Sequence, residues 1–288
     1  MNRDLRRQIK NLLWRTPETV RRPVARFALR SYESYLAVKA GKDATRHHNG
    51  LPIPPPKLRV LVSGTPDADW FLRGGERQTG FLRELLAAHG QPIDEMEAIL
   101  DFGCGCGRMC RWWLGSKAEV HGCDYNEKLV EWTAENLSFV AARTNKLTPP
   151  LAYRDSQFDC VYALSIFTHL TEANARLWLA ELARVVRPGG LVWITVHGES
   201  FYNQLVGDDH ARFAAGDVVV QFSELEGTNL CATYLSREAV RRLIGTELVI
   251  IDYFDPGVDP AEAKRHELFH DAYLLKRIDM LADDGSAV

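Results

Sequence analysis

Three glycines and two carboxylic acids form the pattern in this sequence that is best suited to chemistry. Residues 99–108 read Ile-Leu-Asp-Phe-Gly-Cys-Gly-Cys-Gly-Arg, which places glycines at positions 103, 105 and 107. Glycine permits a tight turn and lets a ligand approach the main chain closely. Asp101 precedes this turn, and Asp124 follows it 23 residues after Asp101, where a carboxylate can accept both hydroxyls of a ribose. The pattern therefore predicts a site for a ligand that contains a nucleoside.

Alternating strands and helices are expected around this turn. We predict strands at 98–102, 119–123, 137–142, 158–164, 191–196, 248–253 and 271–277. We predict helices at 76–89, 108–114, 127–136, 172–186 and 237–244. This order predicts an α/β fold with a doubly wound, mostly parallel sheet. The glycine-rich turn then lies at the carboxyl end of the first strand, where such sheets bind ligands.

The helix at 172–186 carries the clearest amphipathic pattern. We expect Thr171 to cap its N-terminus and Leu177, Leu182, Val185 and Val186 to face inward. The sequence Arg187-Pro-Gly-Gly190 is expected to end this helix before the next strand.

Three segments are expected to flank or interrupt the main domain. Residues 1–57 are predicted to form a basic helical extension with a stiff proline-rich linker at 51–57, and residues 59–62 a short strand or extended lead-in. The main domain then covers 58–278 with an insertion at 198–235, and 279–288 form a flexible acidic tail. Residues 1–30 carry nine Lys or Arg and two acids, so their net charge is +7 and that of the remainder is −10. Such a basic segment is a solvated or partner-binding helix, or one that contacts an anionic membrane surface or an acidic substrate.

Composition sets wider limits. Hydrophobic residues make up 46% of the chain, charged residues 25%, and the net charge is −3, which is ordinary for a soluble globular protein and demands no nucleic-acid partner. We find no apolar run long enough for a membrane span and no signal-peptide pattern. The six cysteines lie mostly in or beside the expected core, so we expect reduced thiols in a cytoplasmic protein.

The spacing Gly-x-Gly-x-Gly after Asp101 resembles the motif of class I S-adenosylmethionine-dependent methyltransferases and differs from the Gly-x-Gly-x-x-Gly of dinucleotide dehydrogenases. The resemblance extends from about residue 75 to residue 197. Residues 158–170 resemble the fourth strand of that family with the loop after it, and residues 181–192 resemble the helix, turn and fifth strand that follow. The resemblance implies a seven-stranded Rossmann-like sheet, methyltransferase activity, and S-adenosyl-L-methionine as cofactor.

The resemblance also implies roles for individual residues. Asp101 would orient the turn and the methionine amino group, Gly103, Cys104 and Gly105 would line the methionine moiety, and Arg77 would reach its carboxylate. Asp124 would bind the ribose. The residues around the adenine would be Tyr125 and Asn126 as flanks, Asn145 at a position where the family often has Asp, and Lys146 and Leu147 as the edge. Leu164 and Ser165 would lie beside the sulfonium.

The methyl acceptor and the catalytic base are less firmly indicated. His169 follows the fourth strand and either takes a proton from an acceptor hydroxyl or amine, or packs against or caps the helix that begins near Thr171. We expect the acceptor pocket to be built from 60–80 and 198–235, with walls that include Phe71, Phe201, Tyr202 and Tyr234. Their mixed aromatic and polar character favours a small molecule, lipid or glycan, methylated on oxygen or nitrogen, over nucleic acid.

Other interpretations remain open at this point. The spacing of Cys104, Cys106 and Cys110 does not match usual zinc pairs, so we expect buried thiols and no metal. We expect surface positions for His47, His48, His266 and His270, although Glu267 and Asp271 allow a metal near His270. The alternative functions are a non-catalytic binding module with the methyltransferase fold, and an enzyme that uses NAD or a nucleotide sugar.

Overall fold

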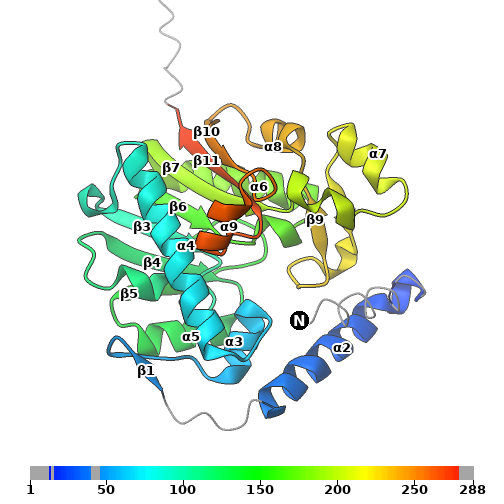
Figure 1. Ribbon diagram of the computed structural model, residues 1–288, viewed down its shortest axis with the longest axis horizontal. Coiled ribbons are helices and arrows are strands. Elements are labelled where there is room, and N and C mark those ends of the chain that lie inside the picture. Colours follow the sequence, from blue (N-terminus) through cyan, green and yellow to red (C-terminus); the bar gives the residue numbers. More distant parts are fainter. Residues whose placement is uncertain (1–12, 14–15, 40–45, 279–288) are drawn as a thin grey trace, which may run out of the picture.

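A seven-stranded sheet forms the centre of the computed structural model, which describes residue 13 and residues 16–39 and 46–278 (Figure 1). Its strands are β3 (Ala98–Phe102), β4 (Glu119–Asp124), β5 (Val140–Thr144), β6 (Phe158–Ala163), β7 (Val186–Val196), β10 (Leu248–Phe254) and β11 (Asp271–Arg277). They lie in the order β10-β11-β7-β6-β3-β4-β5, and β11 is antiparallel to both neighbours while β7 to β5 are parallel. This confirms the expected doubly wound, mostly parallel sheet.

Helices cover both faces of this sheet. The α-helices are α2 (Glu18–Lys39), α3 (Pro56–Ser63), α4 (Ala68–Ala88), α5 (Glu127–Asn136), α6 (Glu172–Val185), α7 (Asp209–Ala214), α8 (Arg237–Leu243) and α9 (Pro260–His266). Short 3₁₀ turns are η1 (Ile93–Glu95), η2 (Cys110–Trp113), η3 (Phe167–His169), η4 (Glu199–Gln204) and η5 (Ser223–Leu225). None of the described helices combines the length and the apolarity that crossing a bilayer requires.

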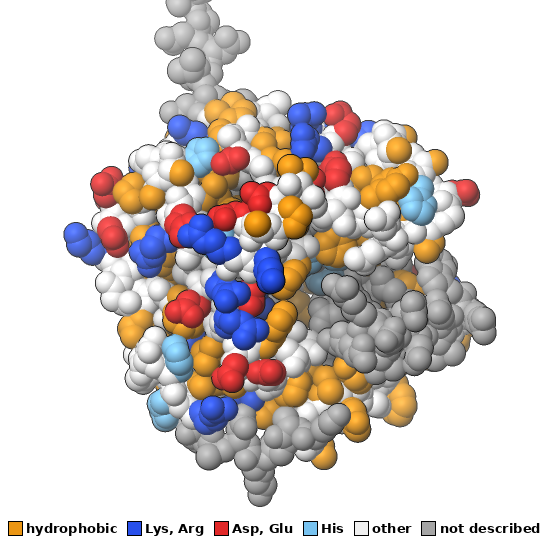
Figure 2. All heavy atoms as spheres, viewed as in Figure 1, with side chains coloured by type: hydrophobic (Ala, Val, Ile, Leu, Met, Phe, Trp, Pro, Cys, Tyr) orange, Lys and Arg blue, Asp and Glu red, His pale blue; other side chains and the backbone are white. Residues whose placement is uncertain are grey.

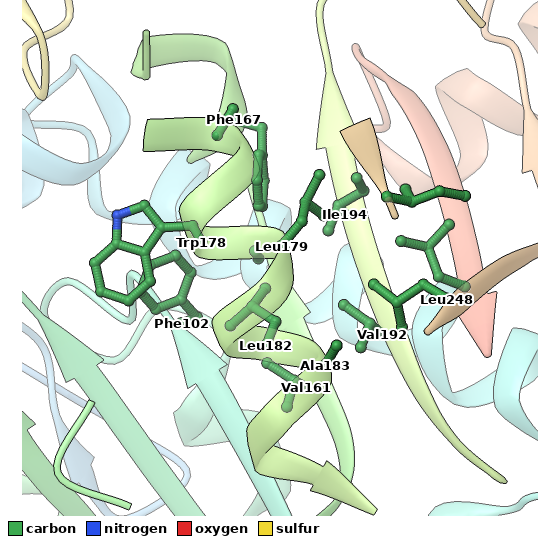
Figure 3. Close-up of a cluster of buried hydrophobic side chains, with 14 of the residues drawn as sticks. Phe102, Val161, Phe167, Trp178, Leu179, Leu182, Ala183, Val192, Ile194 and Leu248 are labelled. Atoms are coloured by element: carbon green, nitrogen blue, oxygen red, sulfur yellow. The ribbon is translucent and has the colours of Figure 1, made fainter. Parts of the chain in front are cut away.

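The core divides into two clusters because alternate residues of a strand face opposite sides of the sheet. Leu100, Val161 and Val192 face α6 and α8, and Figure 3 shows Trp178 of α6 against Phe102, with ring centroids 4.5 Å apart. Ile99, Cys160, Tyr162 and Trp193 face the other way, toward Leu82 and Leu86 of α4. The central strands are therefore apolar on both faces, as expected for the middle of a parallel sheet.

α6 follows its predicted pattern except at Leu177. The Thr171 hydroxyl accepts a hydrogen bond from the Asn174 N–H at 3.4 Å, which confirms the expected N-cap. Leu182, Val185 and Val186 are buried, but Leu177 is 51% exposed, so its predicted inward orientation is wrong. The buried face of the helix contains Ala175, Trp178 and Leu179, which follow helical spacing. Leu177 lies on the opposite, solvent-facing side of the helix. The sequence Arg187-Pro-Gly-Gly190 belongs to β7, which begins directly where α6 ends.

The predicted strand at 59–62 is also wrong, because these residues lie inside α3. Pro56 stands in the first turn of this helix, where its missing N–H breaks no helical hydrogen bond. Leu58, Leu61 and Val62 of α3 then pack with Phe71 of α4. Of the expected extended linker 51–57, Leu51–Pro52 forms the short strand β2, which pairs with β1 (His47–His48), and Pro56 and Lys57 begin α3.

The helix expected at 108–114 is only the four-residue turn η2, since two glycines in the left-handed region limit it. Gly107 has φ 71° before it and Gly115 has φ 82° after it. α4 is longer than predicted and begins at Ala68, where the Asp67 carboxylate accepts the Trp70 N–H at 3.0 Å. A Cβ atom at Gly75 of α4 would lie 2.2 Å from the Arg108 carbonyl oxygen. Gly75 therefore allows α4 to lie directly against the glycine-rich turn.

The insertion 198–235 folds beside the carboxyl end of β7. It contains η4, α7, η5 and a hairpin of β8 (Val219–Gln221) with β9 (Ala232–Tyr234). α2 packs on this unit, where Ala25 lies in one cluster with Phe222 and Leu225, and Arg21 pairs with Glu224 at 3.0 Å. Residues 1–12 of the predicted basic extension and the tail 279–288 lie outside the described residues.

Asp159, at the start of β6, holds the first residues of β3 in place through hydrogen bonds to their main chain. This contact predicts an effect on stability. Its carboxylate is buried and accepts the N–H groups of Glu97 and Ala98 at 2.7 and 2.8 Å, while Arg187 pairs with it at 2.6 Å. We expect Asp159→Ala to lower the free energy of unfolding by roughly 2–4 kcal/mol, because it leaves buried donors without an acceptor. Asp155→Ala removes an exposed partner of Arg184 and should cost no more than about 1 kcal/mol. Urea unfolding of both variants measures the difference, and equal losses would contradict the assigned role.

Candidate functional site

Two adjoining cavities open at the carboxyl ends of the parallel strands. The first has a volume of about 290 Å³ and lies at the ends of β3, β4 and β6, where the strand order reverses between β3 and β6. The second has a volume of about 250 Å³ and lies between α4, the end of β7 and residues 267–270. Six residues line both cavities: Val62, Arg108, Leu164, Ser165, His169 and Asn229. A ligand in one cavity therefore meets a ligand in the other at this shared wall.

The glycine-rich turn forms the floor of the first cavity. The N–H groups of Gly103 and Cys104 donate to the Cys123 carbonyl at 2.8 and 3.0 Å, which joins the turn to β4. Gly103 has φ 85°, and a Cβ atom there would lie 2.0 Å from the Ile166 side chain. The turn thus exposes bare main chain to the cavity, and no larger residue fits at Gly103 without displacement.

Asp124 is the last residue of β4, and each of its two carboxylate oxygens already accepts one hydrogen bond. Oδ2 accepts the Gly105 N–H at 3.0 Å and Oδ1 accepts the Asn126 N–H at 2.8 Å. Burial raises the pKa of this carboxyl, and these two hydrogen bonds act in the opposite direction. Each oxygen of a carboxylate accepts more than one hydrogen bond. Asp124 is therefore held in place with acceptor capacity left for a ligand's hydroxyls.

Asp101 lies deeper, at the end of β3. Burial raises its pKa to about 7, and the Cys110 thiol donates a hydrogen bond to its Oδ2 at 3.2 Å. Because this carboxyl lines the first cavity, a cationic group of a ligand would favour its ionised form.

The far end of the first cavity is formed by residues 145–147 and the loop at 227–229. The Asn145 N–H donates to the Asp124 carbonyl at 3.0 Å, which continues the pairing of β4 and β5. The side-chain Oδ1 of Asn145 is buried and has no hydrogen-bond partner among the described residues. The Tyr125 hydroxyl donates to the Gly227 carbonyl at 2.5 Å, so the insertion closes over this end. An unsatisfied acceptor here suits a ligand that presents an N–H group.

The structure brings together every predicted cofactor residue except Arg77. The residues of this set that line the first cavity are Asp101, Gly103, Cys104, Gly105, Asp124, Tyr125, Asn126, Asn145, Lys146, Leu147, Leu164 and Ser165, together with His169. Arg77 lies on α4, lines neither cavity, and pairs with Glu267 at 3.2 Å.

Arg108 is the cation that lines both cavities instead. It is half-buried, its guanidinium donates to the Gln78 amide oxygen, and no carboxylate of the described residues lies within ion-pair distance of it. Its position directly after the last glycine of the motif was the available sequence signal.

Glu267 is a second residue whose role the sequence did not indicate. Its Oε1 accepts from Arg73 at 2.6 Å and from Arg77, and its main-chain carbonyl accepts from the Gln78 amide at 2.8 Å. Figure 2 shows the resulting mixture of basic and acidic side chains over α4 and α9. The other oxygen, Oε2, is buried and lacks a hydrogen-bond partner in the described part of the chain. It lines the second cavity and provides an acceptor there.

Three histidines surround the second cavity. The Nδ1 atom of His169 lies 2.7 Å from the Cys231 carbonyl, so this nitrogen donates, and Nε2 of the neutral ring carries the lone pair. The His270 Nδ1 lies 2.9 Å from the Ser165 hydroxyl oxygen, and the His197 ring lies 5.1 Å from that of His270. His169 therefore lies at the junction of the cavities, with its Nδ1 donating to the Cys231 carbonyl.

The regions expected to form the acceptor pocket line the second cavity, but through residues other than the predicted ones. Phe71 and Tyr234 are buried in the core, Phe201 packs on His197, and Tyr202 packs on His210. None of the four lines either cavity. Trp70 and Phe269, with nearly parallel rings 6.0 Å apart, line the second cavity instead. Phe71 is buried between α4 and α3, whereas its neighbour Trp70 is half-buried at the second cavity.

Two of the histidines differ from the expected surface positions. His266 is only 4% exposed and lies 2.9 Å from Glu262 and 3.6 Å from Glu84, a grouping of metal-ligand type away from both cavities. Arg265 pairs with both of these glutamates, which offsets part of their negative charge. His270 is half-buried in the second cavity.

Comparison with known proteins adds independent information. A family model described as a methyltransferase domain matches residues 99–190. The chain is 33% identical over 114 residues to a tRNA (carboxymethyluridine(34)-5-O)-methyltransferase of Arabidopsis thaliana, a match that covers 38% of this chain and 26% of that enzyme. It is 31% identical over 168 residues to a ubiquinone biosynthesis O-methyltransferase of Mesorhizobium japonicum, covering 49% of this chain and 66% of that enzyme. It thus spans about a quarter of the plant enzyme and just under two thirds of the bacterial one.

The fold comparison agrees. An S-adenosylmethionine-dependent methyltransferase of Mesorhizobium loti superposes with a TM-score of 0.52 at 17% identity, over 71% of this chain and 100% of that chain. The family match runs from β3 through the glycine-rich turn and β4 to the start of β7, so it covers most of the residues that line the first cavity. Residues 99–190 therefore form a methyltransferase domain, and the chain has the Rossmann-like fold of S-adenosylmethionine-dependent methyltransferases.

Proposed function

We propose that this chain transfers the methyl group of S-adenosylmethionine to an oxygen or nitrogen atom of a small molecule, lipid or glycan. The observation that carries the proposal is the contact of two cavities along one wall that contains His169, Ser165 and Arg108. The first cavity would hold the cofactor, and the second the acceptor. A methyltransferase needs little more than this alignment, because the sulfonium of the cofactor supplies an already reactive methyl group.

The residues of the first cavity fit each part of the cofactor. The orphaned Asn145 Oδ1 would accept from the adenine amino group, and Asp124 would accept from the ribose hydroxyls. Asp101 would face the methionine ammonium, whose charge favours the ionised carboxylate. Gly103 and Gly105 would leave room for the chain between them.

We assign the methionine carboxylate to Arg108 instead of Arg77. Arg77 is already paired with Glu267 on the outer side of α4. Arg108 lines the first cavity and is half-buried; Asp101 and Glu267 attract it, but no carboxylate of the described side chains lies within ion-pair distance. A guanidinium in this position would gain most from an anionic ligand.

The second cavity would position the acceptor and accept its proton. His169 would take the proton from the attacking hydroxyl or amine at Nε2, since Nδ1 is committed to the Cys231 carbonyl. The Glu267 Oε2 would accept a hydrogen bond from another polar group of the acceptor, and Trp70 and Phe269 would contact its apolar part. The volume of about 250 Å³ favours a small acceptor or the end of a larger one.

The function is tested by ligand binding and product release. We expect S-adenosylhomocysteine to bind in calorimetry while NAD does not, and we expect S-adenosylhomocysteine release when panels of small hydroxyl and amine compounds are supplied. His169→Gln should lower kcat roughly 10²–10⁴-fold, because it removes the base, and should leave the affinity for S-adenosylhomocysteine unchanged. Tight binding of NAD without binding of S-adenosylhomocysteine, or binding of neither compound, would refute the proposal. Undiminished turnover of the His169 variant would refute the base.

Two nucleoside ligands, one with and one without an amino-acid moiety, test the two ends of the first cavity separately. We expect Arg108→Met to weaken S-adenosylhomocysteine binding about 10–100-fold but to leave 5′-methylthioadenosine, which has no amino-acid moiety, unaffected. Asp124→Ala should weaken both ligands strongly, since the ribose loses its acceptor. Arg77→Met is the matched control and should change neither affinity. Isothermal titration of the three variants measures this, and a loss at Arg77 equal to that at Arg108 would reverse the assignment.

The raised pKa of Asp101 predicts a pH-dependent stability of the ligand-free protein. The folded chain keeps a proton on Asp101 up to about pH 7, whereas the unfolded chain releases it near pH 4. The associated stability is complete below about pH 4 and is lost as the pH rises to about 7, by about 1.4 kcal/mol per pH unit. We expect the unfolding free energy of the wild type to fall relative to Asp101→Asn over this range. The exposed Asp94→Asn control should show no such slope, and a slope of opposite sign at Asp101 would contradict the burial argument.

A further inference from the structure

The outward face of α2 is unusually apolar for the surface of this protein. Among the described residues, thirteen large hydrophobic side chains are exposed, and four of them lie on this one helix: Val20, Phe27, Tyr35 and Val38. Phe27 is 76% exposed and Val38 is 80% exposed. Figure 1 shows α2 along one edge of the molecule, where it packs against α3.

These side chains form a stripe because of their spacing. Val20, Phe27 and Val38 follow one another at intervals of 7 and 11 residues, each close to a whole number of α-helical turns. Arg26 and Arg30 lie one turn apart along one side of this stripe, and Arg22 lies one turn before Arg26; all three are exposed. The whole helix has five basic residues, with Arg21 and Lys39 completing the set, against the acids Glu18 and Glu33. It is a basic amphipathic helix.

The opposite face of α2 is occupied by the protein itself. Ala25 is buried against the insertion, Arg21 pairs with Glu224, and Leu29 lines the first cavity. These contacts fix which side of the helix points outward. They also make α2 part of the wall of the first cavity.

We propose that the outward face of α2 binds the surface of an anionic lipid bilayer. The arginines would meet the lipid phosphates while Phe27, Val20 and Val38 enter the boundary between headgroups and acyl chains. The charge of α2 supports this partner, because the helix has five basic residues against two acids, whereas residues 31–288 together carry a net charge of −10. A nucleic acid would satisfy the arginines but would leave the apolar stripe exposed to water.

Sedimentation with vesicles tests the proposal, using the whole 288-residue chain. We expect binding to vesicles of equal parts phosphatidylglycerol and phosphatidylcholine, and much weaker binding to phosphatidylcholine alone. Phe27→Ser with Val38→Ser should reduce binding to the anionic vesicles roughly tenfold or more. Arg26→Gln with Arg30→Gln should reduce it roughly thirtyfold and flatten its dependence on salt.

Two control variants keep the result interpretable. Val258→Ser and Arg241→Gln change an exposed apolar and an exposed basic residue elsewhere and should bind vesicles like the wild type. The substituted α2 residues point outward, so circular dichroism and the affinity for S-adenosylhomocysteine should not change in any variant, which separates this proposal from the methyltransferase assignment. No vesicle binding, equal binding to both vesicle types, or equal losses in the control variants would overturn the proposal, as would a preference for tRNA that displaces the protein from vesicles.

Discussion

The hydrogen bond from the Gly105 N–H to the Asp124 carboxylate joins the two elements on which the first cavity depends. It connects the turn after β3 to the end of β4, and the Gly103 and Cys104 N–H groups add two further bonds to the same strand. Because the turn has little side-chain volume of its own, its shape comes from this attachment. The carboxylate that would receive the ribose is thus also the group that holds the turn, so binding and folding share one residue.

Much of the fold followed from the sequence because the strands of a parallel sheet are continuous apolar runs. Strands β3, β4, β6 and β11 and helix α5 lie within two residues of their predicted bounds. The errors fall where tertiary contacts outweigh local pattern. Residues 59–62 look extended beside the prolines but form α3 against α4, and the turn η2 is cut short by glycines whose positive φ angles the sequence did not specify.

The candidate site was predictable in the same unequal way. Residues of the first cavity stand at strand ends in a spaced motif, so they were found from the sequence, whereas the second cavity gathers single residues from distant segments. Glu267 lines it from the C-cap position of α9, in a left-handed conformation. Gln78 and Trp70 line it from α4, and the first turns of this helix were not predicted because glycines follow them. Arg77 and Arg108 could not be ranked until the structure placed Glu267 next to the first of them.

The burial of the cysteines has an experimental consequence. All six thiols are buried, and Cys104, Cys106, Cys110 and Cys123 lie in or beside the glycine-rich turn. Cys106, Cys110 and Cys123 line neither cavity, so a thiol reagent reaches them only when this region opens, and the rate at which these three thiols are modified reports how often the turn separates from β4. A nucleoside that contacts both the turn and the strand would slow that rate. Modification of the native cysteines therefore measures how firmly a ligand holds the two elements together.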